Sequence, residues 1–247
     1  MFDLQGTVCL VTGASGFIGS QVCRALAGQG ATVVALYHEH PEGVDATAVG
    51  GQPAGDIYPL QLDLSQRNAV AAAVTNILEE HGRIDVLVYT AGTALRKSAM
   101  LTSYEDCDRV FELNFKAVAQ LCRTVLRPMF RQSSGRIILI GSTAGERGLA
   151  GQSVYAASKA AVHAYARSLA QEVGDKGITV NVVAPGALTG SGSSIYTAQD
   201  EDRVKELIGL RRLGQAHEVA AAVAFLASHE ASYISGAILP VDGAARF

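Results

Sequence analysis

Short apolar runs alternate with longer amphipathic stretches along the whole chain. Runs such as 7–11, 32–36 and 85–88 are rich in apolar residues, and most of them lead into a stretch with helical periodicity. Strands without a polar face are typical of a parallel sheet buried on both sides by its crossover helices. The pattern predicts an α/β fold with a doubly wound parallel sheet, flanked by helices on both faces and joined by right-handed crossovers.

The predicted elements fill the chain without a long linker, repeat or low-complexity block. We expect strands at 7–11, 32–36, 58–62, 85–88, 136–140, 179–183 and 237–241. We expect helices at 16–29, 66–81, 104–131, 153–173 and 217–227. Residues 1–247 are therefore interpreted as a single domain, because this length suits one large α/β unit.

Two stretches rich in turn residues break the alternation. Residues 38–55 contain Gly, Pro, Glu and His and predict an irregular surface loop. Residues 186–202 follow the sixth predicted strand, and ligands bind beyond the carboxyl ends of strands in open α/β sheets. We therefore expect a flexible substrate loop near 186–205, with an ordinary connecting loop as the alternative.

Composition and charge argue against several classes of protein. Hydrophobic residues make up 49% of the chain, and the net charge of −3 argues against a nucleic-acid partner. No apolar run approaches the ~18 residues of a membrane span, and the start of the chain lacks a signal-peptide pattern. We expect a cytoplasmic protein without membrane contact. Separated cysteines predict buried thiols and no metal site. They are Cys9, Cys23, Cys107 and Cys122.

A glycine-rich turn joins the first predicted strand to the first predicted helix. Gly13 permits the tight turn, Gly16 permits close approach of backbone to a pyrophosphate, and Gly19 lets the helix pack against the strand. The N–H groups and the dipole at the helix start favour a phosphate. This context predicts a Rossmann-type dinucleotide site. The turn comprises Thr12, Gly13, Ala14, Ser15, Gly16, Phe17, Ile18 and Gly19.

The end of the second predicted strand bears on the choice of dinucleotide. An acidic residue there would bind the ribose 2′-hydroxyl of NAD, and a basic residue would bind the 2′-phosphate of NADP. Tyr37 is not acidic and His38 can donate to a phosphate, whereas Glu39 weakens the argument. We expect NADP(H) as the cofactor, and NAD(H) stays open.

A group of polar side chains can transfer a proton. Tyr155 and Lys159 are four residues apart and share one face of a predicted helix. A free tyrosine has a pKa of about 10, and a nearby ammonium is expected to lower it toward the working range of a general acid or base. Ser142 follows the fifth predicted strand and can hydrogen-bond a substrate oxygen. Asn114, a poor helix former inside a predicted helix, can hold a backbone or water link in the proton path.

With these motifs the chain resembles the short-chain dehydrogenase/reductase family from end to end. The resemblance implies that Ser142, Tyr155 and Lys159 form the catalytic triad, with Asn114 as its fourth member. Lys159 would also hold the nicotinamide ribose. Taken with the motifs above, the expected cofactor contacts are Gly13, Ser15, Gly16, Phe17, Ile18, Gly19, His38, Asp63, Leu64, Thr90, Ala91, Gly92, Tyr155, Lys159, Pro185, Gly186 and Leu188.

Within this family the chain is most similar to 3-oxoacyl-[acyl-carrier-protein] reductases. This similarity implies hydride transfer from NADPH to a β-keto carbon and protonation of its oxygen by Tyr155, in fatty-acid or polyketide-like synthesis. The similar stretches are 135–140, 155–158, 177–186, 212–214 and 222–228.

The same similarity implies protein partners. Arg131 and Lys176 would contact an acidic acyl carrier protein, although charged residues at helix ends are also common without a partner. In this family the helix equivalent to 153–173 pairs across a two-fold axis, which implies a homodimer or homotetramer.

Several positions depart from that subgroup and keep other functions open. Phe17 replaces a glycine, and Gly16 replaces an arginine that is common in NADP-preferring reductases. Tyr89 either reshapes the site or packs in the core, and His163 is interpreted as a packing or interface residue. One alternative is an NAD(P)-dependent dehydrogenase of a small free alcohol or ketone, such as a sugar, cyclic alcohol or steroid. Another is a non-catalytic dinucleotide-binding sensor, against which the intact triad argues.

Overall fold

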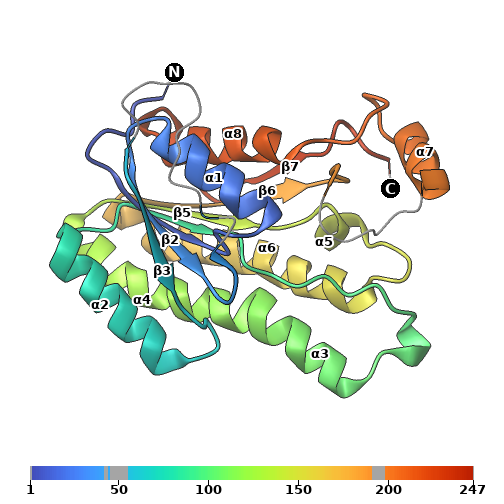
Figure 1. Ribbon diagram of the computed structural model, residues 1–247, viewed down its shortest axis with the longest axis horizontal. Helices are drawn as coiled ribbons and strands as arrows, with labels where there is room; N and C mark the ends of the chain where they lie inside the picture. Colours follow the sequence, from blue (N-terminus) through green and yellow to red (C-terminus); the bar gives the residue numbers. More distant parts are fainter. Residues whose placement is uncertain (1, 42–43, 45–54, 191–197, 247) are drawn as a thin grey trace.

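The computed structural model describes residues 2–41, 44, 55–190 and 198–246. These residues form an all-parallel sheet with the strand order β3-β2-β1-β4-β5-β6-β7 (Figure 1). The strands are β1 (Val8–Thr12), β2 (Thr32–Tyr37), β3 (Ile57–Gln61), β4 (Val86–Tyr89), β5 (Gly135–Ile140), β6 (Ile178–Pro185) and β7 (Ile238–Val241).

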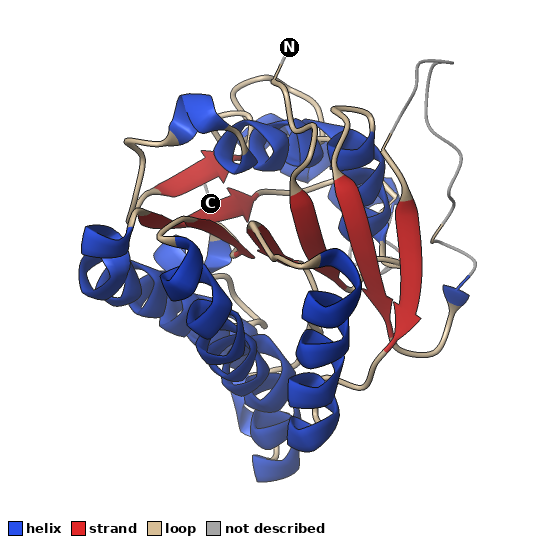
Figure 2. Cartoon of the chain, turned by 90° about the vertical axis from the view of Figure 1, so that its left-hand side faces the viewer, coloured by secondary structure: helices blue, strands red, loops and turns tan. Residues whose placement is uncertain are grey.

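Helices cover both faces of the sheet, as Figures 1 and 2 show. One face is covered by α1 and α8 and the other by α2, α4 and α6, and an apolar cluster fills the space beneath each layer. No helix among the described residues has the length and apolar character needed to cross a membrane. The helices are α1 (Phe17–Ala27), α2 (Arg67–His81), α3 (Tyr104–Phe111), α4 (Ala117–Gln132), α5 (Ala144–Arg147), α6 (Ser153–Val173), α7 (Ala198–Leu207) and α8 (Ala216–Ala227).

The predicted doubly wound parallel sheet is confirmed. The bounds of every predicted strand lie within two residues of an observed strand, and α6 begins and ends at the predicted residues. This agreement has a physical cause, because strands such as β1 and β6 are buried along their whole length and must be apolar on both faces.

The helix predicted over 104–131 contains an irregular turn. Ser103 starts α3 with a capping box that it shares with Asp106. A π-helical turn at Glu112–Lys116 then joins α3 to α4. Such a turn carries an extra residue within the helix and is often found at functional sites. In this chain it contains Asn114, one of the predicted catalytic residues.

The substrate loop predicted near 186–205 is wrong in its second half, because α7 begins at Ala198. Residues 191–197 lie outside the described residues. The sequence of α7 is mostly polar, and its buried contacts come from Val204 and the adjoining Ile208, so it lacks the apolar periodicity of the other helices. The short helix α5 was also not predicted. Most of the loop predicted at 38–55 lies outside the described residues.

The strand order creates a crevice at one edge of the sheet. β1 has β2 on one side and β4 on the other, so the chain winds in opposite directions from this point. Ligands bind beyond the carboxyl ends of strands at such a switch point. The glycine turn follows β1, residues 90–92 follow β4 and Ser142 follows β5. The predicted motifs therefore meet at this edge.

Candidate active site

The glycine turn after β1 leaves no room for a side chain at Gly13 or at Gly19. Gly13 has a φ of +60°, and a Cβ atom there would lie 2.9 Å from the Cα of Ala91. A Cβ on Gly19 would overlap the carbonyl oxygen of Gly13. No side chain caps the start of α1 at Gly16, so the first N–H groups of the helix can bind a ligand. This backbone cradle fits the pyrophosphate of a dinucleotide.

The hydroxyls of Thr12 and Thr90 hold the glycine turn against the neighbouring strand. The Oγ1 of Thr12 accepts hydrogen bonds from the backbone N–H of Thr90 at 3.1 Å and of Ala91 at 3.2 Å. The Thr90 hydroxyl donates to the Thr12 carbonyl at 2.5 Å. Thr12 is fully buried and was not predicted as a site residue. The sequence signal that could have found it is a polar residue at the end of an apolar strand.

One half of the cleft is a cavity of about 590 Å³ beside the ends of β2 and β3. His38 lies between two carboxylates, with Nδ1 3.5 Å from Glu39 and Nε2 4.0 Å from Asp63. Hydrogen bonds from the hydroxyl and the N–H of Ser65 hold the pKa of the Asp63 carboxyl below its usual range. The predicted residues that line this cavity are Gly13, Ser15, Gly16, His38, Asp63, Leu64, Thr90, Ala91 and Gly92.

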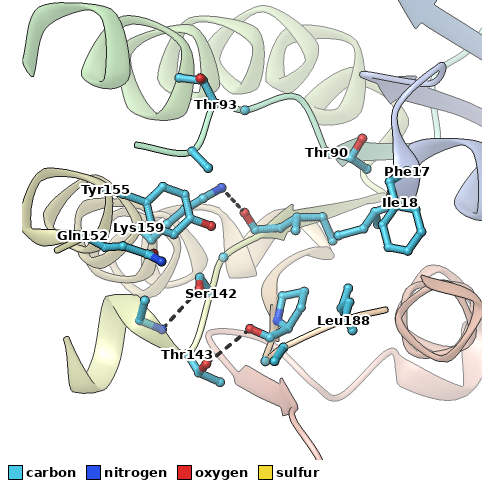
Figure 3. A pocket seen from close by; sticks show the side chains of 18 of the residues that line it. Phe17, Ile18, Thr90, Thr93, Ser142, Thr143, Gln152, Tyr155, Lys159 and Leu188 are labelled. Atoms are coloured by element: carbon cyan, nitrogen blue, oxygen red, sulfur yellow. Dashed lines mark hydrogen bonds between the residues drawn. The ribbon is translucent and has the colours of Figure 1, made fainter. Parts of the chain in front are cut away.

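The other half of the cleft is a cavity of about 310 Å³ between α1 and α6 (Figure 3). The side chains of Ser142 and Tyr155 lie next to each other in this cavity (Figure 3), and the Ser142 Oγ accepts a hydrogen bond from the N–H of Ala144 at 3.2 Å. The Nζ of Lys159 donates to the carbonyl of Ile140 at 2.8 Å and lies 5.9 Å from the centre of the Tyr155 ring. The predicted residues that line this cavity are Gly13, Gly16, Phe17, Ile18, Gly19, Thr90, Gly92, Ser142, Tyr155, Lys159, Pro185, Gly186 and Leu188.

The two cavities share residues of the glycine turn and of the segment after β4, so they form one continuous cleft. The larger half lies beside the end of β2, where the adenosine end of a dinucleotide binds in this fold class. The smaller half holds the triad. We call them the adenosine half and the catalytic half.

Burial sets the charge states in the catalytic half. Burial raises the pKa of Tyr155, and the neighbouring Ser142 hydroxyl opposes that shift. Burial also lowers the pKa of Lys159 to about 8. The expectation that Lys159 lowers the pKa of Tyr155 is therefore wrong for this arrangement. The Lys159 Nζ is directed to the Ile140 carbonyl, and loss of water disfavours the phenolate. Tyr155 is kept neutral, which is the form that donates a proton.

Asn114 supports the site from behind and does not line either cavity. It is 1% exposed, and its Oδ1 accepts a hydrogen bond from the N–H of Thr93 at 2.8 Å. Its Nδ2 donates to the Thr93 carbonyl and to the Ser158 hydroxyl, both at 3.0 Å. The π turn thus places one amide so that it fixes the backbone of Thr93, which does line the catalytic half.

This arrangement lies within a region that matches a known family. Residues 13–244 match the family model described as enoyl-(acyl carrier protein) reductase. The chain belongs to the short-chain dehydrogenase/reductase family. It is 38% identical over 243 residues to nodulation protein G of Rhizobium sp. (strain N33). It is 37% and 36% identical over 246 residues to the 3-oxoacyl-[acyl-carrier-protein] reductases of Salmonella typhimurium and Escherichia coli (strain K12). Each alignment covers 98% of both chains.

As a short-chain dehydrogenase/reductase the chain is an oxidoreductase, and the geometry assigns a task to each group. Ser142 and Tyr155 present two hydroxyls close to one point, where both can hydrogen-bond a single substrate oxygen. Tyr155 can then donate its proton to that oxygen as a general acid. Lys159 brings an ammonium to the same face of α6 below pH 8. The charge of Lys159 acts strongly in this site because its side chain is buried, which removes the screening by water.

The cleft also contains residues that the dehydrogenase/reductase motifs did not reveal. Gln152 is buried and lies three residues before Tyr155, a helical spacing that could have identified it. Thr143 donates its N–H to the Pro185 carbonyl at 3.1 Å, a contact that depends on the pairing of β5 with β6 and leaves no sequence signal. Further lining residues are Thr93, Ala94, Leu149 and Ala187 in one half, and Arg109, Glu112, Leu113 and Ala117 in the other.

Two residues with ambiguous sequence roles belong to the core of this reductase. Tyr89 is 2% exposed, and its hydroxyl donates to the Leu113 carbonyl at 2.9 Å. Tyr89 packs and lines neither cavity. His163 is buried beside Gly141 and Val182, and burial lowers its pKa. It packs behind the segment that carries Ser142.

The predicted carrier-protein residues lie at the opposite edge of the sheet from the triad. Arg131 is in the last turn of α4, and Lys176 is in a short turn before β6. A Cβ on Gly177 would lie 2.8 Å from the Ser133 carbonyl, so these two turns are adjacent. Both precede the amino ends of strands, whereas Ser142 follows a carboxyl end. Within one chain, neither residue is close to the triad.

Proposed function

We propose that this reductase converts 3-oxoacyl thioesters, linked to an acyl carrier protein, to 3-hydroxyacyl thioesters. The observation that carries the proposal is the pair of neighbouring hydroxyls, those of Ser142 and Tyr155, in the catalytic half of the cleft. Burial keeps Tyr155 protonated, so it is ready to donate a proton to an oxygen. Reduction of a ketone needs this proton transfer. Relatives that match along nearly the whole chain are named 3-oxoacyl-[acyl-carrier-protein] reductases.

The family description refers to enoyl reduction, which is a different reaction. Hydride addition to a conjugated enoyl thioester places negative charge on the thioester oxygen, whereas hydride addition to a ketone places it on the oxygen bound to the reacting carbon. The paired hydroxyls of Ser142 and Tyr155 are suited to an oxygen on which negative charge develops. Both reactions can use such a pair, so the ketone is favoured as the substrate group by the relatives named 3-oxoacyl-[acyl-carrier-protein] reductases.

We propose NADP(H) as the cofactor, with NAD(H) as a weaker ligand. When bound, the reduced nicotinamide supplies the hydride. The backbone of the glycine turn would hold the pyrophosphate, and His38 would donate to the 2′-phosphate. Glu39, 3.5 Å from His38, opposes this preference through its negative charge. Lys159 would hold the nicotinamide ribose.

The carrier protein would reach the triad with help from a second copy of the chain. α6 runs from Ser153 to Val173, so Tyr155 near its start and Lys176 beyond its end are roughly 30 Å apart. If α6 packs antiparallel against α6 of another copy, the Arg131 and Lys176 end of one copy faces the Tyr155 end of the other. We therefore propose a homodimer or homotetramer, in which these basic residues contact the carrier.

A comparison of substrates tests the function. Loss of NADPH and of NADH absorbance is measured with an acetoacetyl thioester, a crotonyl thioester and a cyclic ketone, each with wild type and Tyr155→Phe. We expect rapid NADPH loss with the acetoacetyl thioester, abolished by the substitution. Turnover of the crotonyl thioester alone would make the chain an enoyl reductase. Turnover of the cyclic ketone alone would support a free-alcohol dehydrogenase. Cofactor binding without any turnover would support a sensor.

A further inference from the structure

The end of the chain is held by an arginine of the short helix α5. The Nη1 of Arg147 donates to the Ala245 carbonyl at 2.5 Å. Its Nη2 lies 3.1 Å from the Oδ2 of Asp242, whose side chain is only 7% exposed. This second contact is an ion pair without hydrogen-bond alignment, since Oδ2 accepts no hydrogen bond from the described residues. Arg147 therefore neutralises a buried carboxylate and anchors the chain three residues beyond it.

Asp242 in turn lies directly behind the cleft. A Cβ on Gly186 would lie 2.8 Å from the Cβ of Asp242 and 2.9 Å from its Cα. The N–H of Gly186 also donates to the Val241 carbonyl at 3.0 Å. Gly186 lines the catalytic half, so any shift of Asp242 moves a wall of that cavity.

The arginine itself stands on a fixed support. A Cβ on Gly145 of α5 would lie 2.8 Å from the backbone carbonyl carbon of Lys159 and from the N of Ala160. This close packing presses α5 against α6 on the turn that carries the catalytic lysine. Arg147 therefore extends from the same rigid unit as Ser142 and Lys159, and it connects that unit to the Gly186 wall.

We propose that Arg147 is a positioning residue for the nicotinamide end of the dinucleotide. It acts through Asp242, which sets the distance between the Gly186 wall and the triad. The adenosine half of the cleft shares none of these contacts, because its lining comes from the glycine turn, the ends of β2 and β3, the segments after β3 and β4, and α3 to α4. Binding of the nicotinamide end should therefore depend on Arg147, whereas binding of the adenosine end should not. The role of Arg147 rests on dinucleotide binding by this cleft, as in the proposed function.

The contributions of the nicotinamide end and the adenosine end can be measured separately with two ligands. The dissociation constants of NADPH and of 2′-phospho-ADP-ribose, which lacks the nicotinamide, are measured by titration for wild type and Arg147→Met. We expect NADPH affinity to fall about tenfold and the affinity of the fragment to stay within about twofold. A misplacement on the order of 1 Å also reduces rate strongly, so kcat should fall by roughly a hundredfold. Equal weakening of both ligands, or no weakening of either, would overturn the proposal.

Control variants distinguish position from general stability. Arg83 and Asp85 form a comparable ion pair at the opposite edge of the sheet, 2.6 Å apart, with the Asp85 side chain 14% exposed. Arg83→Met should lower stability without separating the two affinities; a similar separation in this variant would contradict a specific role for Arg147.

Two further variants keep the test informative if Arg147→Met folds poorly. Arg147→Lys keeps the positive charge, but a single ammonium cannot contact both Asp242 and the Ala245 carbonyl as a guanidinium does. NADPH affinity should therefore fall less in this variant than in Arg147→Met. Arg147→Met combined with Asp242→Asn removes the unpaired charge; recovery of stability without recovery of NADPH affinity is expected. Full recovery of NADPH affinity in the double variant would show that Arg147 only neutralises the charge of Asp242 and does not position the cleft. Failure of the wild type to bind NADPH would instead disprove the proposed function.

Discussion

The two halves of the cleft differ in how deeply their polar side chains are buried. In the catalytic half Lys159 is 6% exposed, and Asn114 directly behind it is 1% exposed; both are held by hydrogen bonds to backbone. In the adenosine half, the side chains of His38 and Glu39 are 62% and 68% exposed, and their partners are other surface residues. The groups that we propose for the chemistry are thus fixed before the substrate arrives, whereas the groups that we propose to select the cofactor remain on the surface.

The difference in burial translates into a difference in energy. Preorganised donors in a shielded cavity stabilise developing charge by several kcal/mol, because little water competes with them. Charge pairs on a protein surface contribute about 0–1 kcal/mol each. Substitutions in the catalytic half should therefore change rates by orders of magnitude, and substitutions in the adenosine half should shift preferences modestly.

The largest effect on rate is expected from a substitution of Tyr155 in the catalytic half. Tyr155→Phe removes the proton donor and keeps the ring, so kcat should fall by roughly a thousandfold while the dissociation constant of NADPH changes little. Steady-state kinetics and a fluorescence titration measure the two quantities. Near-normal turnover in this variant would remove Tyr155 from its role as the general acid.

An intermediate effect is expected from pH. The pKa of Lys159 is lowered to about 8, so its ammonium is present below pH 8 and is lost above it. The pKa of Tyr155 is raised, so its proton remains in this range. If the ammonium supports catalysis, kcat for reduction should be level below pH 8 and should decline as the pH rises through that value. Lys159→Arg should abolish this decline, and a wild-type profile that is level to pH 10 would show that the charge is not needed.

The smallest effect is expected from substitutions of His38 and Glu39 in the adenosine half, which should change the preference for NADPH over NADH. His38→Asp should shift the ratio of kcat/KM for NADPH and NADH toward NADH by about tenfold, since a hydrogen bond to a charged phosphate contributes about 1.5–3 kcal/mol. Glu39→Gln is the matched change in the opposite direction and should raise the NADPH preference by a few fold. An unchanged ratio in both variants would mean that other residues select the cofactor.

The same division between the halves explains what the sequence could predict. The strands of the sheet, the glycine turn and the triad carry local signals, such as apolar runs and the four-residue spacing of Tyr155 and Lys159. The family and the oxidoreductase class followed from them, and the comparisons confirm both. The pKa of Tyr155 was predicted in the wrong direction, because spacing reveals a nearby lysine but not where its Nζ points.

Contacts between distant segments were beyond sequence reasoning. The ion pair of Arg147 with Asp242 joins residues that are far apart in the chain and that no local pattern connects. The helix α7 was missed for the opposite reason, since it has local structure but buries too little apolar surface to leave a periodic signal.

The π turn at Glu112–Lys116 fixes the number of residues between the start of α3 and the end of α4. An α-helix completes a turn in 3.6 residues, so the loss of one residue would rotate all of α4 by roughly 100° relative to α3. Leu121, Val125 and Met129 would then leave the apolar layer under the sheet, and the amide beneath Thr93 would be displaced at the same time. Evolution can therefore replace many side chains along α3 and α4, but it should almost never insert or delete a residue there.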